Sequence, residues 1–227
     1  MSGKLILLAV FVASMILMSF NFHRKKKIIF FGDSLTQLGA ATNGYIPMIQ
    51  EMLAKEGMVD QYELVGSGIS GNKVTDLYLR LEEDVLQKNP SIVVIYIGIN
   101  DIWHKQTSGT GTDIMKYVQF YEAIIKKLQA AGIKVVVCTP SVIGERKDFS
   151  NEQDGDLNNY SNWLRYYAKT NNIPCVDLRT SFLNYLIANN EKNIDKGLLT
   201  ADRVHLNLQG NQLVAEEIWK VLKTIKP

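Results

Sequence analysis

Residues 28–35 read Ile28-Ile29-Phe30-Phe31-Gly32-Asp33-Ser34-Leu35, and this stretch indicates how the chain folds. Four consecutive apolar residues are typical of a short strand that is buried on both faces. The glycine after them turns the chain, and a following Asp or Ser is suited to cap a helix. We therefore predict that Ser34 lies where the first strand ends and a helix begins.

The same alternation continues along the rest of the chain. Further short apolar runs predict strands at 62–66, 91–97, 133–139 and 173–177. Between and after them, apolar residues at spacings of three and four predict helices at 45–56, 72–88, 113–130, 156–170, 179–190 and 208–224. Alternating strands and helices predict an α/β fold, with a parallel sheet, right-handed crossovers and helices on both faces.

Composition is consistent with one domain around one core. The chain has 227 residues, of which 46% are hydrophobic, and no linker rich in Pro, Gly or Ser divides it. A net charge of +2 gives no reason to expect a nucleic-acid partner. Cys138 and Cys175 lie in apolar strand-like runs, so we predict buried free thiols.

Four short blocks carry residues suited to chemistry. Each block taken alone is simply a turn or a helix cap. Together they fall at the ends of separate predicted strands and before the last helix, where an open parallel sheet gathers its ligand site. They supply a nucleophile, hydrogen-bond donors and an acid/base pair, and they are Gly32-Asp33-Ser34-Leu35, Gly68, Gly98-Ile99-Asn100-Asp101 and Asp202-Arg203-Val204-His205.

The nucleophile and its base can be assigned from residue type and spacing. A serine hydroxyl such as that of Ser34 needs a base within hydrogen-bond reach, and imidazole is suited to that task near neutral pH. His205 is the natural base, and Asp202, three residues earlier, is close enough in a tight turn to hold the second ring nitrogen. His23 lies in a basic N-terminal run and competes poorly for this role. Thr36 stands where the Gly-x-Ser-x-Gly elbow has glycine, so that motif is excluded.

Residues 28–223 resemble the SGNH hydrolase superfamily, also called the GDSL esterases and lipases. The resemblance rests on the four blocks and on the stretches around them, namely residues 28–32, 67–72 and 198–207. It implies a three-layer, flavodoxin-like fold with a five-stranded parallel sheet in the order 2-1-3-4-5. It also implies an oxyanion hole made by the backbone amides of Ser34 and Gly68 and the side-chain amide of Asn100. Asp33 and Asp101, beside these residues, are expected to have structural roles.

Two loops after strand ends are expected to shape the substrate pocket. Residues 104–112 and 140–155 supply the region, and the pocket candidates are Trp103, His104 and Arg146. For His104 the alternative is an exposed loop histidine, and for Arg146 a solvated arginine rather than one that meets an anionic substrate. Neither loop contains a phosphate-binding glycine motif or a cluster of metal ligands, so we expect no metal and no cofactor.

Three functions are compatible with these residues. The first is hydrolysis of a carboxylic ester of a small or medium acyl group through an acyl-enzyme, the substrate being an acetylated sugar, a short-chain ester or a lysophospholipid. The second is transfer of the acyl group to an acceptor other than water by the same residues. The third is an inactive binding module, against which the intact Ser34, Asp202 and His205 argue.

The first 27 residues form a separate segment. Leu5 to Phe20 is an apolar run interrupted only by Ser14 and Ser19, with Lys4 before it and the basic residues 24–27 after it. It is long for a signal-peptide core, short for a membrane span, and lacks an Ala-x-Ala cleavage site. We expect residues 1–27 to target or anchor an exported or membrane-attached enzyme whose catalytic domain is 28–227. Cleavage and retention both remain open, as does orientation, because the heavier positive charge follows the run.

Overall fold

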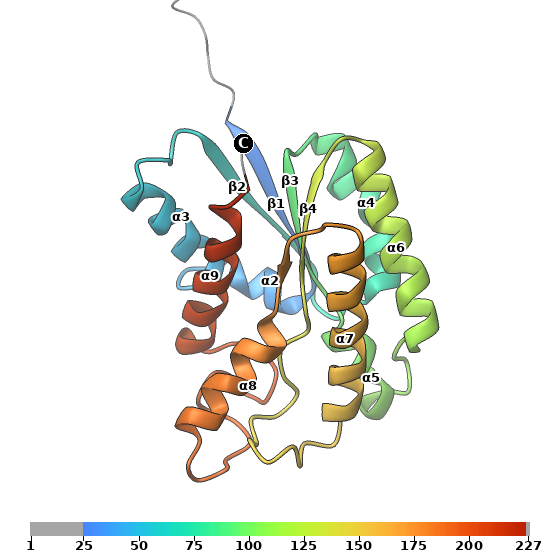
Figure 1. Ribbon diagram of the computed structural model, residues 1–227, viewed down its shortest axis with the longest axis vertical. Helices are drawn as coiled ribbons and strands as arrows, with labels where there is room; N and C mark the ends of the chain where they lie inside the picture. The colour runs from blue at the N-terminus through green and yellow to red at the C-terminus, as the bar shows by residue number, and fades with distance from the viewer. Residues whose placement is uncertain (1–24, 226–227) are drawn as a thin grey trace, which may run out of the picture.

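The computed structural model describes residues 25–225, which form a parallel sheet with helices on both sides (Figure 1). The sheet has the strand order β2-β1-β3-β4-β5, and every pair of neighbours is parallel. Its strands are β1 (Lys26–Gly32), β2 (Tyr62–Gly68), β3 (Ile92–Tyr96), β4 (Lys134–Cys138) and β5 (Cys175–Val176). The predicted fold class and strand order are confirmed.

Helices cover both faces of this sheet. Figure 1 shows α3 and α9 packed together on one side and α4 and α6 on the other. The helices are α2 (Ser34–Gly39), α3 (Tyr45–Lys55), α4 (Val74–Asp84), α5 (Ile99–Thr107), α6 (Ile114–Ala130), α7 (Asp154–Thr170), α8 (Leu178–Asn189) and α9 (Leu208–Leu222), with a 3-10 turn at Leu86–Lys88.

The central strands are buried because both of their faces meet helices. Ile29, Phe30 and Phe31 of β1 are fully buried, as are Val93 and Ile95 of β3. Burying one such side chain contributes about 1.5–3 kcal/mol relative to leaving it in water. The continuous apolar runs seen in the sequence therefore become the middle of the core.

Several element boundaries differ from the prediction. The helix predicted at 72–88 ends at Asp84, and the chain passes through the 3-10 turn to Asn89, which has a positive φ of 47°. Pro90 explains this break, because proline disfavours helical geometry in the residue before it. The predicted loop at 104–112 begins later, since α5 extends to Thr107. The strand predicted at 173–177 is reduced to Cys175–Val176.

Residues 1–24 of the predicted targeting segment, His23 among them, lie outside the described residues. Lys26 and Lys27 open β1, so the strand begins two residues before the expected domain start at 28. Within residues 25–225, none of the helices combines the length and apolar character that a membrane crossing requires. Both cysteines are free thiols, Cys138 buried and Cys175 half-buried.

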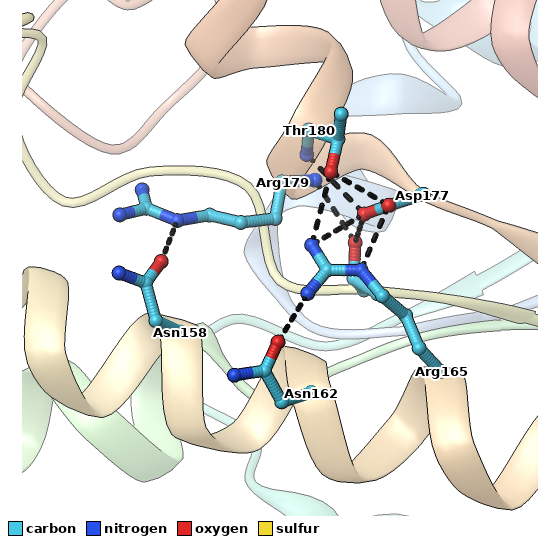
Figure 2. A network of polar contacts seen from close by, with 7 residues as sticks. Asn158, Asn162, Arg165, Asp177, Arg179 and Thr180 are labelled. Carbon is cyan, nitrogen blue, oxygen red and sulfur yellow. Dashed lines mark hydrogen bonds and ion pairs between the residues drawn. The ribbon is translucent and has the colours of Figure 1, made fainter.

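A polar network fixes α7 against the start of α8 (Figure 2). Arg165 of α7 forms an ion pair with Asp177, which caps α8, at 2.7 Å. Arg179, only 1% exposed, donates to Asp154 at 2.7 Å and to Asn158 at 2.9 Å. Removing one partner of a buried pair of this kind costs about 3–5 kcal/mol. The start of α7 is therefore held rigidly near the carboxyl ends of β4 and β5.

Candidate active site

Ser34 is the first residue of α2, and only the N-cap residue Asp33 separates it from Gly32 at the end of β1. Asp33 caps this helix by accepting a hydrogen bond from the amide of Leu35 at 2.9 Å. Gly32 is required at the strand end, because an added Cβ would lie 2.3 Å from the carbonyl oxygen of Tyr96. The tight turn directs Ser34 to the carboxyl edge of the sheet, where the amino end of α2 presents free amides.

The structure brings the side chains of Ser34, His205 and Asp202 into one hydrogen-bonded row. The Oγ of Ser34 lies 3.0 Å from Nε2 of His205, and Nδ1 of His205 lies 2.7 Å from Oδ2 of Asp202. Asp202 also accepts from the backbone amides of Val204 and His205, at 3.1 and 2.8 Å. This is the arrangement in which an imidazole accepts a hydroxyl proton while a carboxylate holds its other nitrogen.

Partial burial and hydrogen bonding act in opposite directions on Asp202. Burial raises the pKa of its carboxyl, but hydrogen bonds from the side chain and backbone of His205 and from Val204 hold that pKa below its usual value. Asp202 is therefore a carboxylate at neutral pH, as an imidazolium partner requires.

Arg203, between Asp202 and His205, has a positive φ of 88°. A non-glycine residue held in this region costs of order 1–3 kcal/mol, and such strain is found where surrounding contacts enforce it. Here the carbonyl of Arg203 accepts from the amide of Gly144 at 2.8 Å, and the amide of Ala201 donates to the carbonyl of His205 at 2.8 Å. The loop is thus closed on itself and tied to the loop after β4.

A buried carboxylate holds the segment that leads into the same loop. Glu145, which is fully buried, accepts from the backbone amides of Leu198, Leu199 and Thr200 and from the hydroxyl of Thr200 at 2.5–2.8 Å. No local sequence pattern predicts this role of Glu145, because the amides that it accepts from lie more than fifty positions later in the chain.

The other predicted donors are Gly68, the last residue of β2, and Asn100, in the first turn of α5, which follows β3. Gly68 pairs with Gly32 in the sheet, and the amide of Ile69 donates to the carbonyl of Gly32 at 3.2 Å. Since successive amides of a strand point to opposite sides, the Gly68 amide points away from β1. Asn100 is buried and donates one amide hydrogen to the carbonyl of Asn72 at 3.1 Å, which leaves its second hydrogen for another acceptor.

Arg80 of α4, whose role no local sequence pattern predicts, bonds the ends of both β1 and β2. Its guanidinium donates to the carbonyls of Gly32 and Ser67, at 2.7 and 3.2 Å, and to the side chain of Asn72 at 2.8 Å. It also lies 4.4 Å over the ring of Phe31. Arg80 thus contacts the residues next to Gly68 and the residue that accepts from Asn100.

Asp33 and Asp101, the sequence neighbours of Ser34 and Asn100, are both buried. Burial raises the pKa of each carboxyl to about 7. Asp101 accepts from the amide of Val74 at 3.2 Å, while Oδ2 of Asp33 has no hydrogen-bond partner among the described residues. Both side chains accept hydrogen bonds from backbone amides at the starts of helices, Asp33 from Leu35 of α2 and Asp101 from Val74 of α4.

The three predicted pocket residues, Trp103, His104 and Arg146, lie in surroundings that differ from one another. The ring of Trp103 lies 6.2 Å from that of His205, edge to face. His104 belongs to α5 rather than to a loop, and burial, together with nearby Lys73, lowers the pKa of its imidazole. Arg146 is exposed in the loop after β4, and in the described part of the chain its side chain forms no hydrogen bond or ion pair with Ser34, Asp202 or His205. In the described part of the chain, no group of three or more His, Cys, Asp or Glu side chains is placed to hold a metal ion.

Comparison with known proteins gives a consistent result. Residues 30–213 match the model of the GDSL-like Lipase/Acylhydrolase family. The acetylxylan esterase of Geobacillus stearothermophilus is 30% identical over 208 residues, which cover 84% of this chain and 90% of that protein.

Solved structures agree with the family match. The crystal structure of the acetyl xylan esterase AlAXEase matches with a TM-score of 0.84 and 57% identity, covering 86% of this chain and 98% of that chain. LAE5, an alpha/beta hydrolase enzyme from the metagenome of Lake Arreo, shares the fold at a TM-score of 0.76 and 22% identity, with coverage of 91% and 100%.

Proposed function

Because this chain belongs to the GDSL-like lipase/acylhydrolase family and is an SGNH-type serine esterase, we propose that it hydrolyses acetyl esters of xylose-based carbohydrates. The contact that carries the proposed chemistry is the 3.0 Å approach of Ser34 Oγ to His205 Nε2. The substrate class is supported by the acetylxylan esterase at 30% identity and by the acetyl xylan esterase at 57% identity.

The first half of the reaction forms an acyl-enzyme. The Oγ of Ser34 attacks the acetyl carbonyl carbon while His205 Nε2 takes the hydroxyl proton, and Asp202 stabilises the resulting imidazolium. When the tetrahedral intermediate collapses, the ester C–O bond breaks and His205 returns the proton to the leaving sugar oxygen. The sugar leaves as a free alcohol, and the acetyl group stays on Ser34.

Three donors stabilise the negative charge that develops on the carbonyl oxygen. These are the backbone amides of Ser34 and Gly68 and the second amide hydrogen of Asn100. Loss of one such donor typically costs about 2.7–4 kcal/mol of transition-state stabilisation. Support for this assignment comes from the Ile69 amide bonding Gly32, which leaves the preceding amide, that of Gly68, out of the β1–β2 pairing, and from the fixed orientation of Asn100 against Asn72.

The second half of the reaction consumes water. His205 takes a proton from a water molecule, whose oxygen attacks the acetyl-serine carbonyl, and the proton returns to Ser34 as acetate leaves. The side chains of His205 and Asp202 are 26% and 50% exposed. Such access favours water over an acceptor alcohol, since acyl transfer depends on excluding water.

The test is acetate release from acetylated xylan and acetylated xylo-oligosaccharides, compared with 4-nitrophenyl acetate and octanoate and with a lysophospholipid. We expect the acetyl substrates to be turned over and Ser34→Ala to be inactive but folded, with a fluorophosphonate labelling Ser34 alone in the parent enzyme. Adding an acceptor alcohol should leave acetate as the main product. Preference for octanoate or lysophospholipid, or an active Ser34→Ala variant, would overturn the proposal.

The N-terminal segment fits a substrate met at the cell surface. We propose that residues 1–27 export or anchor the enzyme, as the apolar run from Leu5 to Phe20 indicates. Fractionation of cells that produce the full chain, with and without residues 1–24, tests this. Equal amounts of both forms in the soluble cytosolic fraction would contradict it.

A further inference from the structure

A cavity of about 240 Å³ is lined by Trp103, whose ring meets that of His205, and the proposed reaction makes no use of it. Its walls come from α5, from the residues at the start of α7, from the loop after β4 and from the Asp202–His205 loop. The residues on which its chemistry depends are Trp103, Gln106, Ile143, Glu152, Gln153 and Arg203.

Trp103 joins this cavity to the reacting groups. Its indole lines the cavity and also meets the His205 ring edge to face, with an interplanar angle of 73°. His205 must deliver its proton to the leaving oxygen, so the alcohol part of the ester lies on the His205 side of the scissile bond. A group attached to that oxygen therefore extends toward Trp103 and away from the acetyl side.

We propose that this cavity is the subsite for the alcohol part of the ester, and that it binds one sugar ring. The proposal rests on the proposed function and extends it from the acetyl group to the group that leaves. The cavity volume is below the roughly 300–1,000 Å³ typical of sites for drug-sized ligands. A cavity of this size suits a single sugar ring rather than a lipid or a longer oligosaccharide.

The wall chemistry matches a sugar. A flat indole offers an apolar face to the ring C–H groups, while hydroxyl groups need charged or amide partners around the rim. Arg203 lines the cavity with a side chain that is 44% exposed and whose Nε faces Asp195 at 3.6 Å, so the outer nitrogens of its guanidinium are the donors for a hydroxyl group. Glu152 adds an exposed carboxylate that accepts from hydroxyl groups, and Gln106 adds an amide.

The walls are held in place before any ligand arrives. Gln153 donates to the carbonyl of Ile102 at 2.6 Å, which links the start of α7 to α5. Arg179 and Asp154 fix the same helix start from the other side. Arg203 is held at a strained backbone angle by Gly144. A rigid pocket loses less entropy on binding, which favours recognition of one ring geometry.

The test compares two acetates for each variant, an acetylated methyl xyloside and ethyl acetate, which lacks a ring. The quantity measured is the ratio of kcat/KM on the sugar acetate to kcat/KM on ethyl acetate. We expect Trp103→Leu and Arg203→Asn to lower this ratio at least tenfold, because each removes a wall of the ring subsite. Asn tolerates the positive φ at position 203, so that variant keeps the loop geometry. Glu152→Gln, at an exposed position, should lower the ratio severalfold and carries the test if Trp103→Leu does not fold.

Tyr166→Leu is the matched control, because Tyr166 is an aromatic residue of α7 that is 71% exposed and lies outside the cavity. Its ratio should equal that of the parent enzyme. Unchanged ratios in the cavity variants would overturn the subsite while leaving the esterase assignment intact. Equal losses on both acetates would also overturn it, since Trp103 would then act only through His205. A parent enzyme inactive on both acetates would instead refute the proposed function.

Discussion

Replacing Gly68 with alanine tests the geometry of the oxyanion hole directly. A Cβ at position 68 would lie 2.2 Å from the amide nitrogen of Gln37 and 2.6 Å from the carbonyl oxygen of Asp33. Ordinary contacts of this kind are about 3.5–4.0 Å, and both partners are backbone atoms that no rotamer change can move. The end of β2 and the start of α2, which carries Ser34, must therefore separate by about 1 Å.

Two losses follow from this separation. Overpacking of this kind typically costs about 1–3 kcal/mol of stability, which for a chain of this size lowers Tm by roughly 2–12 °C. A donor displaced by about 1 Å no longer reaches the developing oxyanion. We therefore expect kcat to fall by about a hundredfold to a thousandfold while KM changes little.

The assay is steady-state hydrolysis of 4-nitrophenyl acetate well below the Tm of each protein, with Tm measured separately. Gly155→Ala is the control, because no heavy atom lies within 4 Å of its added Cβ and the residue belongs to α7. It should keep the parent kcat and an equal or higher Tm. A Gly68→Ala variant with parent kcat and lowered Tm would place the Gly68 amide outside the reaction. A variant with parent Tm would show that the steric reasoning is wrong.

Three further perturbations separate catalysis from folding. Asn100→Ala should lower kcat by about a hundredfold to a thousandfold, and Asn100→Asp should be at least as harmful because it sets a carboxylate against the developing negative charge; near-parent kcat in the aspartate variant would refute the donor role. Arg80→Lys should lower kcat more than it raises KM, because a lysine cannot bond Gly32, Ser67 and Asn72 together, and parent kinetics would argue against a positioning role. Asp33, with a pKa raised by burial to about 7, keeps a proton in the folded state that the unfolded chain loses near pH 4. Stability should therefore fall as pH rises from 4 to 7, by at most about 1.4 kcal/mol per pH unit from this group, and level off above 7. Asp33→Asn should make the dependence seen in urea unfolding shallower without removing it, because the pKa of Asp101 is also raised by burial to about 7, and an unchanged slope would show that Asp33 does not contribute to it.

Local patterns predicted the parts of the fold that depend on local sequence. The run from Ile28 to Phe31 predicted a buried strand because burial on both faces leaves a continuous apolar signature. The spacing of Asp202 and His205 predicted their contact because both belong to one tight turn. In contrast, the loop predicted at 104–112 includes the second half of α5, because the buried residues of this helix all lie in its first half, between Ile99 and Ile102, and the polar residues after Trp103 carry no apolar periodicity.

Residues that act across the fold left no such signal. Arg80 lies 48 positions from Gly32, and Glu145 lies 53 positions from Leu198. A charged residue on a helix or in a loop is most simply a solvated one, and only the packing of distant segments reveals otherwise. The same holds for the cavity at Trp103, whose walls come from four separate parts of the chain.

The carboxylate of Glu145 has a consequence for protein engineering. The amides of Leu198, Leu199 and Thr200 converge on it, so the segment that ends at His205 is not a self-contained cassette. Grafting that segment onto another scaffold would transfer Asp202 and His205 without Glu145, the residue that anchors them. The graft would keep its sequence but lose the position that the Glu145 carboxylate gives it. Likewise, length changes in the loop after β4 that displace Glu145 would be transmitted to His205 although the two residues are sixty positions apart. Loop libraries for new substrate preferences should therefore vary residues 146–150 and leave Glu145 in place.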